Sequence, residues 1–239
     1  MSTLHAIIIG SLVGVVGTGL GGAATYFFKN PSARFFSGIM GITAGLMLSV
    51  VAFDLLPHAF DIAGLPLGIT GILIGAILIS FFDMVIENMD IAVGFIKEGV
   101  LLGIAIALHN FPEGLAVGSG FMVSSSLGID IALVIALHDF PEGLAMATPF
   151  SAGGVPPYKN VIYTLLAGIP TGIGALIGVL TGGISPNFIG LNLGIAGGAM
   201  LYVTCGDIVP EARNIYKGQI SILGMILGVI GGIIITRYL

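Results

Sequence analysis

Two copies of one short motif carry most of the residues in this chain that could do chemistry. Residues 106–116 read IALHNFPEGLA and residues 135–145 read IALHDFPEGLA, so the motif recurs with one substitution. On a helix, side chains three and four residues apart lie on one face. Each copy therefore presents a histidine, an amide or carboxylate and a glutamate together, and the six residues are His109, Asn110, Glu113, His138, Asp139 and Glu142.

The chemistry that suits these residues is metal binding. At the centre of a bilayer each ionised acid would cost about 2.5–3.5 kcal/mol, and no Lys or Arg occurs between Glu98 and Lys159 to offset that cost. The acids must then be protonated, exposed to water or neutralised by a bound cation. Imidazole with carboxylate is a ligand set for Zn²⁺, Fe²⁺ or Mn²⁺, whereas Na⁺ and K⁺ sites are built from oxygen atoms. We therefore expect a site for a divalent transition metal.

A second interpretation is that the motif residues are hydrogen-bonding groups between helices, as single Asn or His residues often are in membranes. Six polar residues in duplicated register, three of them acids with no base other than histidine, argue against it. Pro112 and Pro141 also free the carbonyls of Leu108 and Leu137. Freed carbonyls at membrane depth are tolerated where the backbone lines a cavity or meets a partner.

The composition indicates a membrane protein in which several helices hold the two motifs. Only 8% of the 239 residues are charged, 56% are hydrophobic and the mean hydropathy is +1.12, whereas soluble domains carry about 25% charged residues. The few cations are scattered, which argues against nucleic acid as a partner. We predict an all-α membrane protein, residues 1–239 forming a single transmembrane domain, with eight apolar runs near 4–28, 36–60, 65–86, 98–122, 128–149, 160–181, 188–210 and 219–237.

The cations predict the orientation of these runs. Six of the seven fall in the connections between runs 1 and 2, 3 and 4, 5 and 6, and 7 and 8, and Arg237 alone lies on the opposite side. By the positive-inside rule, both termini should be extracytoplasmic. At 1.5 Å per residue, His109 and His138 then lie roughly 15 Å deep from opposite faces, so the two motifs meet near the middle of the membrane.

A weaker repeat supports this geometry. Run 2 ends with DLLPHA, beginning at Asp54, and run 7 ends with DIVPEA, beginning at Asp207. Because these runs have opposite directions, runs 1–3 and 6–8 are interpreted as inverted repeats around the central pair 4–5. Asp54 and His58 would collect metal at the outer mouth, and Asp207 and Glu211 would receive it inside. Asp83, Glu87 and Asp90 could attract metal at the exit, but a solvated helix end is the simpler interpretation.

At HNFPEG and HDFPEG on consecutive antiparallel runs, the sequence resembles the ZIP (Zrt/Irt-like) family of divalent metal transporters, especially its prokaryotic zinc-uptake branch. The resemblance covers nearly the whole chain. It implies eight spans, a transport site of one or two metals formed by the six motif residues, inward movement of Zn²⁺ with Fe²⁺, Mn²⁺ or Cd²⁺ accepted, and dimerisation. The metal is transported substrate and not a cofactor.

Two departures from the family pattern bear on this expectation. Many prokaryotic relatives carry a Glu in run 6 that contributes to the second metal position, where this chain has Thr171. The connection 87–99 also lacks the histidines usual between runs 3 and 4. One alternative hypothesis is a membrane-embedded metalloenzyme, but the H-E-x-x-H or paired E-x-x-H motifs of such enzymes are absent from this sequence. The other alternative is a metal-selective channel in place of a carrier.

Overall fold

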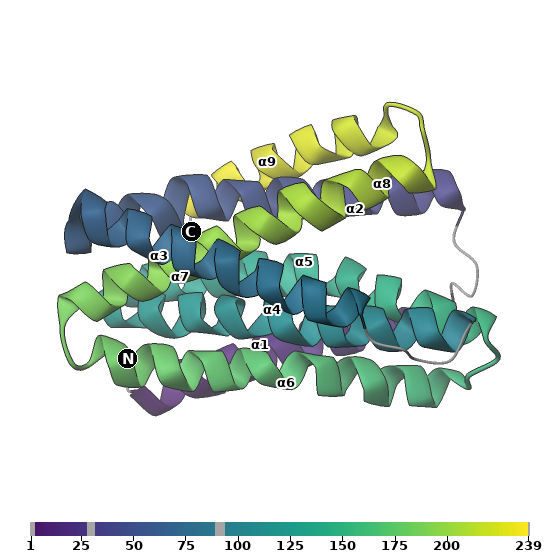
Figure 1. Cartoon of the computed structure of the whole chain (residues 1–239), viewed down its shortest axis with the longest axis horizontal. Helices are drawn as coiled ribbons and strands as arrows, with labels where there is room; N and C mark the ends of the chain where they lie inside the picture. Colours follow the sequence, from purple (N-terminus) through teal and green to yellow (C-terminus); the bar gives the residue numbers. More distant parts are fainter. Residues whose placement is uncertain (1–2, 28–31, 89–93, 239) are drawn as a thin grey trace.

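The computed structural model describes residues 3–27, 32–88 and 94–238, which form helices and short connections without a β-strand (Figure 1). Two five-residue π-helices, η1 (Val51–Leu55) and η2 (Thr204–Ile208), interrupt the α-helical pattern. The α-helices are α1 (Thr3–Ala24), α2 (Ala33–Val50), α3 (Leu56–Glu87), α4 (Phe95–Val123), α5 (Ser125–Ala152), α6 (Pro157–Gly182), α7 (Pro186–Val203), α8 (Val209–Ile215) and α9 (Ile220–Tyr238).

Seven helical stretches of the described chain are long and apolar enough to cross a membrane, which confirms the predicted all-α membrane fold. One of them, 33–86, has 54 residues and would be about 80 Å long if straight, against a hydrocarbon core of roughly 30 Å. It is not straight, because Gly64 has φ 77° and ψ 160°, a conformation that favours glycine. Beyond Gly64 the chain reverses, and the rest of α3 runs opposite to α2 (Figure 1).

The long helices alternate in direction along the chain (Figure 1). α1 begins and α9 finishes at one end of the bundle, which we call the terminal end. Helices α2, α4, α6 and α9 begin at the other end, where the connections carry cations. We call it the basic end, and its described cations are Arg34, Lys97, Lys159, Arg213 and Lys217. The observed helices coincide with the predicted apolar runs to within a few residues.

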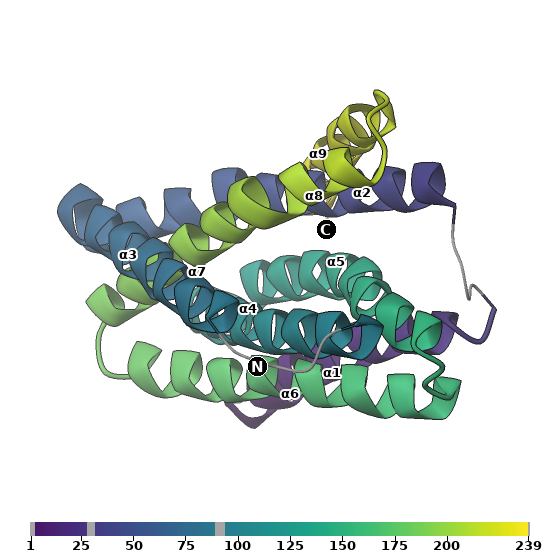
Figure 2. The same cartoon turned by 45° about the vertical axis from the view of Figure 1, so that its right-hand side comes forward.

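The helices form two layers (Figure 2). The motif layer consists of α1, α4, α5 and α6, and the flanking layer consists of α2, α3, α7 and α9 with η1, η2 and α8. Contacts are most extensive inside each layer, between α3 and α7 and between α2 and α9 in one, and between α6 and both α1 and α4 in the other. Both motif copies therefore belong to a single layer.

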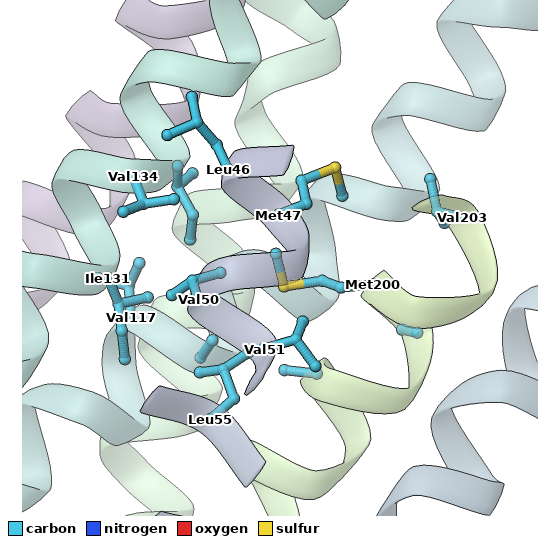
Figure 3. Packing of buried hydrophobic residues seen from close by; sticks show 14 of the residues in the cluster. Leu46, Met47, Val50, Val51, Leu55, Val117, Ile131, Val134, Met200 and Val203 are labelled. Atoms are coloured by element: carbon cyan, nitrogen blue, oxygen red, sulfur yellow. The ribbon is translucent and has the colours of Figure 1, made fainter. Parts of the chain in front are cut away.

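Glycines let the helices inside each layer approach closely. A Cβ at Gly198 of α7 would overlap the carbonyl oxygen of Ile72 on α3, and a Cβ at Gly143 of α5 would overlap that of Thr18 on α1. Small residues at four-residue spacing allow such backbone contact in membranes. The two layers meet differently, through apolar side chains. Figure 3 shows this cluster, with Val50, Val51 and Leu55 of the flanking layer beside Val117, Ile131 and Val134 of the motif layer.

Each Asp-x-x-Pro motif begins in one of the two π-helices, here also called π-turns, and continues into the α-helix that follows. Pro57 and Pro210 have no N–H to donate to the carbonyl four residues earlier, and their rings crowd it. The residue before each proline instead bonds five residues back, with the Leu56 N–H donating to the Val51 carbonyl and the Val209 N–H to that of Thr204. Such π-turns are frequent at functional sites. The predicted repeat of sequence thus corresponds to a repeat of local structure.

The glycine contacts predict different effects on stability for two substitutions on α9. A Cβ at Gly228 would overlap the Ile42 carbonyl of α2, whereas a Cβ at Gly231 would have its nearest neighbour at 3.8 Å. We expect Gly228→Ala to destabilise the protein by about 1–3 kcal/mol through overpacking and Gly231→Ala to leave stability unchanged or slightly raised. Thermal unfolding of both variants in detergent measures the difference. Equal midpoints would contradict the inference that backbone contact holds α2 to α9.

Candidate metal site

The two motif copies come together between α4 and α5. Glu113, His138 and Glu142, here called the central group, each offer a ligand atom, and these atoms lie within 4.8 Å of one another. His138 Nε2 lies 2.9 Å from Glu113 Oε1, so the ring N–H can donate to the carboxylate. All three residues are buried. The central group is thus a compact set of one imidazole and two carboxyl groups inside an apolar bundle.

Most polar atoms of this set have no protein partner. Glu113 Oε2, His138 Nδ1 and both carboxyl oxygens of Glu142 are buried without a hydrogen bond. Among the described residues no Lys or Arg pairs with them, because the ion pairs found there involve only His138. Buried polar groups are ordinarily satisfied, and a divalent cation takes nitrogen and oxygen ligands of this kind. The donor set therefore fits a transition metal.

Two motif residues lie beside the central group and not within it. The Asn110 side-chain N–H donates to the Ala167 carbonyl of α6 over 2.8 Å, which leaves Asn110 Oδ1 unpartnered. Asp139 packs against Gly17 of α1, and its Oδ1 is 3.5 Å from His138 Nε2. Thr171 is also buried near this place, with its backbone against Gly114. These residues extend the polar region towards α1 and α6.

A cavity of about 610 Å³ leads from the central group towards the basic end. His109 lies on its wall, and one ligand atom each from His109, Asp83 of α3 and Asp207 of η2 fall within 4.8 Å of one another. These three residues, here called the cavity group, join the two layers, because α4 belongs to the motif layer and α3 and η2 belong to the flanking layer. The histidine and carboxylates that line the cavity are Asp83, Glu98, His109, Glu142, Asp207 and Glu211.

The predicted outer residues lie towards the terminal end, away from this cavity. Asp54 is buried, and its Oδ2 has no hydrogen bond. His58 is half-buried, and its Nδ1–H donates to the Asp54 carbonyl over 2.7 Å. The apolar cluster of Figure 3 includes Val51 and Leu55, which flank Asp54 in the sequence, together with Val117 and Val134, each four residues from a member of the central group. The four predicted pathway residues are therefore divided between the two ends of the bundle, Asp54 and His58 at one and Asp207 and Glu211 at the other.

Two further acids lie near the motifs. Asp83 is half-buried and lines the cavity beside His109, which favours the alternative that this acid attracts metal at the exit, while Asp90 lies outside the described residues. Asp130 of α5 is buried and was not considered. The ligand atoms beside Asp83, from His109 and Asp207, come from elements that are distant in sequence.

The alternative of a hydrogen-bonding contact between helices explains only part of this geometry. The His138–Glu113 hydrogen bond does join α5 to α4. However, both carboxyl oxygens of Glu142 are buried without a hydrogen bond. Polar side chains that hold membrane helices together do so by forming hydrogen bonds across the helix interface. Unbonded carboxyl oxygens do not fit that role.

The comparisons with known proteins agree with the motifs. A family model described as ZIP Zinc transporter matches residues 85–236. The zinc transporter ZupT of Nitratidesulfovibrio vulgaris is 30% identical over 88% of each chain, and ZupT of Corynebacterium glutamicum is 31% identical over 88% of this chain and 90% of its own. The zinc transporter GufA of Myxococcus xanthus is 30% identical, with the same coverage. This chain belongs to the ZIP family of zinc transporters.

Proposed function

We propose that this protein takes up a divalent transition metal, with Zn²⁺ as the main substrate, across the plasma membrane into the cytoplasm. Its family consists of transporters and not enzymes, which sets the metalloenzyme alternative aside. The observation that carries the proposal is the central group, in which Glu113, His138 and Glu142 bring ligand atoms together with several polar atoms left unpartnered. Fe²⁺, Mn²⁺ and Cd²⁺ suit the same ligands.

The proposed topology is eight spans in one domain, residues 1–239, with spans 1–3 and 6–8 as inverted repeats around spans 4–5. The reversal at Gly64 supports counting 33–86 as two spans. The π-turns at Asp54 and Asp207 support the inverted repeat. Cations at the basic end favour placing that end in the cytoplasm and both termini outside. The dimer that the resemblance implies remains an expectation.

Within the proposed site, Glu113, His138 and Glu142 are the direct ligands, and His109 is a ligand on the cavity side. Asn110 and Asp139 complete a second or shared position, for which Asn110 Oδ1 and both Asp139 oxygens are available. Thr171 offers one unpartnered hydroxyl at the position where the family resemblance implies a carboxylate. Since a neutral hydroxyl is a poorer ligand for a divalent cation than a carboxylate, one strongly held metal is favoured over two.

The arrangement supports a carrier over a channel. Glu142 and His109 line the cavity that opens towards the basic end. On the other side of the central group, Val50, Val117 and Val134 belong to a buried apolar cluster. A metal ion at the central group thus has a polar route in one direction and packed side chains in the other. Asp207 and Glu211 on the cavity wall would receive the metal on its way to the cytoplasm.

Loss of a central carboxylate should abolish transport. We expect Glu113→Ala and Glu142→Ala each to reduce ⁶⁵Zn²⁺ uptake into proteoliposomes by more than the roughly 10–100-fold that loss of an outer-shell partner costs. Ser119→Ala is the matched control, because Ser119 is also a buried polar residue of α4 without a hydrogen bond. Normal uptake by both glutamate variants, with folding verified by size-exclusion chromatography, would overturn the site.

Exchange of the central imidazole should change the metal preference. His138 is the only nitrogen ligand of the central group, and imidazole suits Zn²⁺ whereas carboxylate suits Mn²⁺. We expect His138→Asp to raise the KM for Zn²⁺ relative to that for Mn²⁺. Competition of unlabelled Mn²⁺ against ⁶⁵Zn²⁺ in wild type and variant measures the ratio. A ratio that stays constant would place His138 outside the ligand set.

A further inference from the structure

A second cavity, of about 660 Å³, lies between α4, α5 and α6 at the basic end of the motif layer. It shares no lining residue with the cavity beside the central group. His109 of the first cavity and Val100 of the second are nine residues apart, or two and a half turns at 3.6 residues per turn, so they leave α4 on opposite sides. The second cavity is therefore separate from the proposed metal route.

The interior of this second cavity is apolar. Its inner part belongs to a small buried cluster that includes Met146, Phe150 and Ala167. Its outer edge is formed by side chains on the outside of the bundle, with Ile96 53% and Leu166 55% exposed. Exposed apolar surface around a hollow indicates a membrane contact or a ligand groove. In a membrane-spanning bundle, such a cavity opens sideways into the surrounding lipid.

Lys159 is the one charged residue among the described residues that line this cavity. It is the third residue of α6 and is exposed, and no ion pair of Lys159 is found in the described part of the chain. The long stem of a lysine lies along apolar surface while its ammonium group stays at the membrane boundary. Tyr163 lines the wall one turn deeper, with its ring 5.2 Å from that of Phe150. A positive charge thus stands at the mouth of an apolar interior.

The depth of the cavity matches one half of a bilayer. From Lys159 to Ala167, α6 advances eight residues, or about 12 Å, and the hydrocarbon of one leaflet is roughly 15 Å thick. A soluble anion would use only the mouth, and a neutral hydrocarbon would use only the interior. An anionic phospholipid uses both, and basic pockets between membrane helices bind such headgroups.

We propose that this cavity binds an acyl chain of one anionic phospholipid from the leaflet at the basic end, with its phosphate at Lys159. The volume of the cavity is in the range of roughly 300–1,000 Å³ that is usual for small-molecule sites. Ala167 lines the cavity, and its carbonyl accepts the hydrogen bond from Asn110. The lipid would therefore pack beside the contact that holds α6 to α4 next to the proposed metal site.

The test is lipid binding by the full chain in detergent, measured by native mass spectrometry and independent of transport. The probes are dioleoylphosphatidylglycerol, which is anionic, and dioleoylphosphatidylcholine, which has the same chains. We expect wild type to hold one phosphatidylglycerol about fivefold more tightly than phosphatidylcholine, as one lysine at the surface allows. Lys159→Gln should remove this preference, and Ala107→Phe, which fills the cavity, should weaken the binding of both lipids.

Lys217→Gln is the matched control, because Lys217 is an exposed lysine at the same end that does not line the cavity. Equal affinity of wild type for the two lipids, or the same loss in Lys217→Gln as in Lys159→Gln, would overturn the proposal. A dimer that excludes lipid and that Ala107→Phe dissociates would also overturn it, since a second copy of the chain would then fill the cavity. Lys159→Gln changes an exposed residue and stays decisive if Ala107→Phe fails to fold.

Discussion

Carboxyl groups without cationic partners, buried in the middle of an apolar bundle, are the constraint on which this structure depends. Three ionised acids in such a place would cost roughly 8–10 kcal/mol, comparable to the whole stability of a typical domain. Glu113, Asp139 and Glu142 have no Lys or Arg beside them among the described residues. A folded protein can keep them only if each carries a proton or shares a metal ion. A group that supplies positive charge, such as a divalent cation, therefore suits this place in the bundle.

The helices around that site pack in two different ways, one inside each layer and one between the layers. Inside each layer the backbones touch at glycines, as at Gly198 against Ile72 and Gly143 against Thr18, and such contacts leave little room for rearrangement. Between the layers, side chains such as Val50 and Val134 meet without backbone contact. Glu113, His138 and Glu142 all belong to the motif layer, so the contacts among them do not cross the boundary between the layers.

The fold and the central group could be predicted because their signals are local. Apolar runs of the right length give the helices, and a duplicated motif gives both halves of the site. The place of Asp83 in the cavity could not be decided in this way, because it depends on His109 and Asp207, which come from other helical elements. A single acid near a helix end has the same sequence signature whether it faces water or a buried partner. The hydrogen bond of Asn110 to the Ala167 carbonyl and the close approach of Thr171 to Gly114 were also beyond prediction, because both depend on how closely α6 approaches α4.

The two Asp-x-x-Pro turns have the same chemistry and different surroundings. Both aspartates lie in π-turns ahead of a proline, yet Asp207 lines a cavity while Asp54 is buried under apolar packing. Since the local sequence and backbone are alike, the difference must come from the relative position of the layers. The two matching turns therefore differ in access, because the one at the basic end lines a cavity and the one at the terminal end is covered by side chains, a difference that the proposed carrier requires.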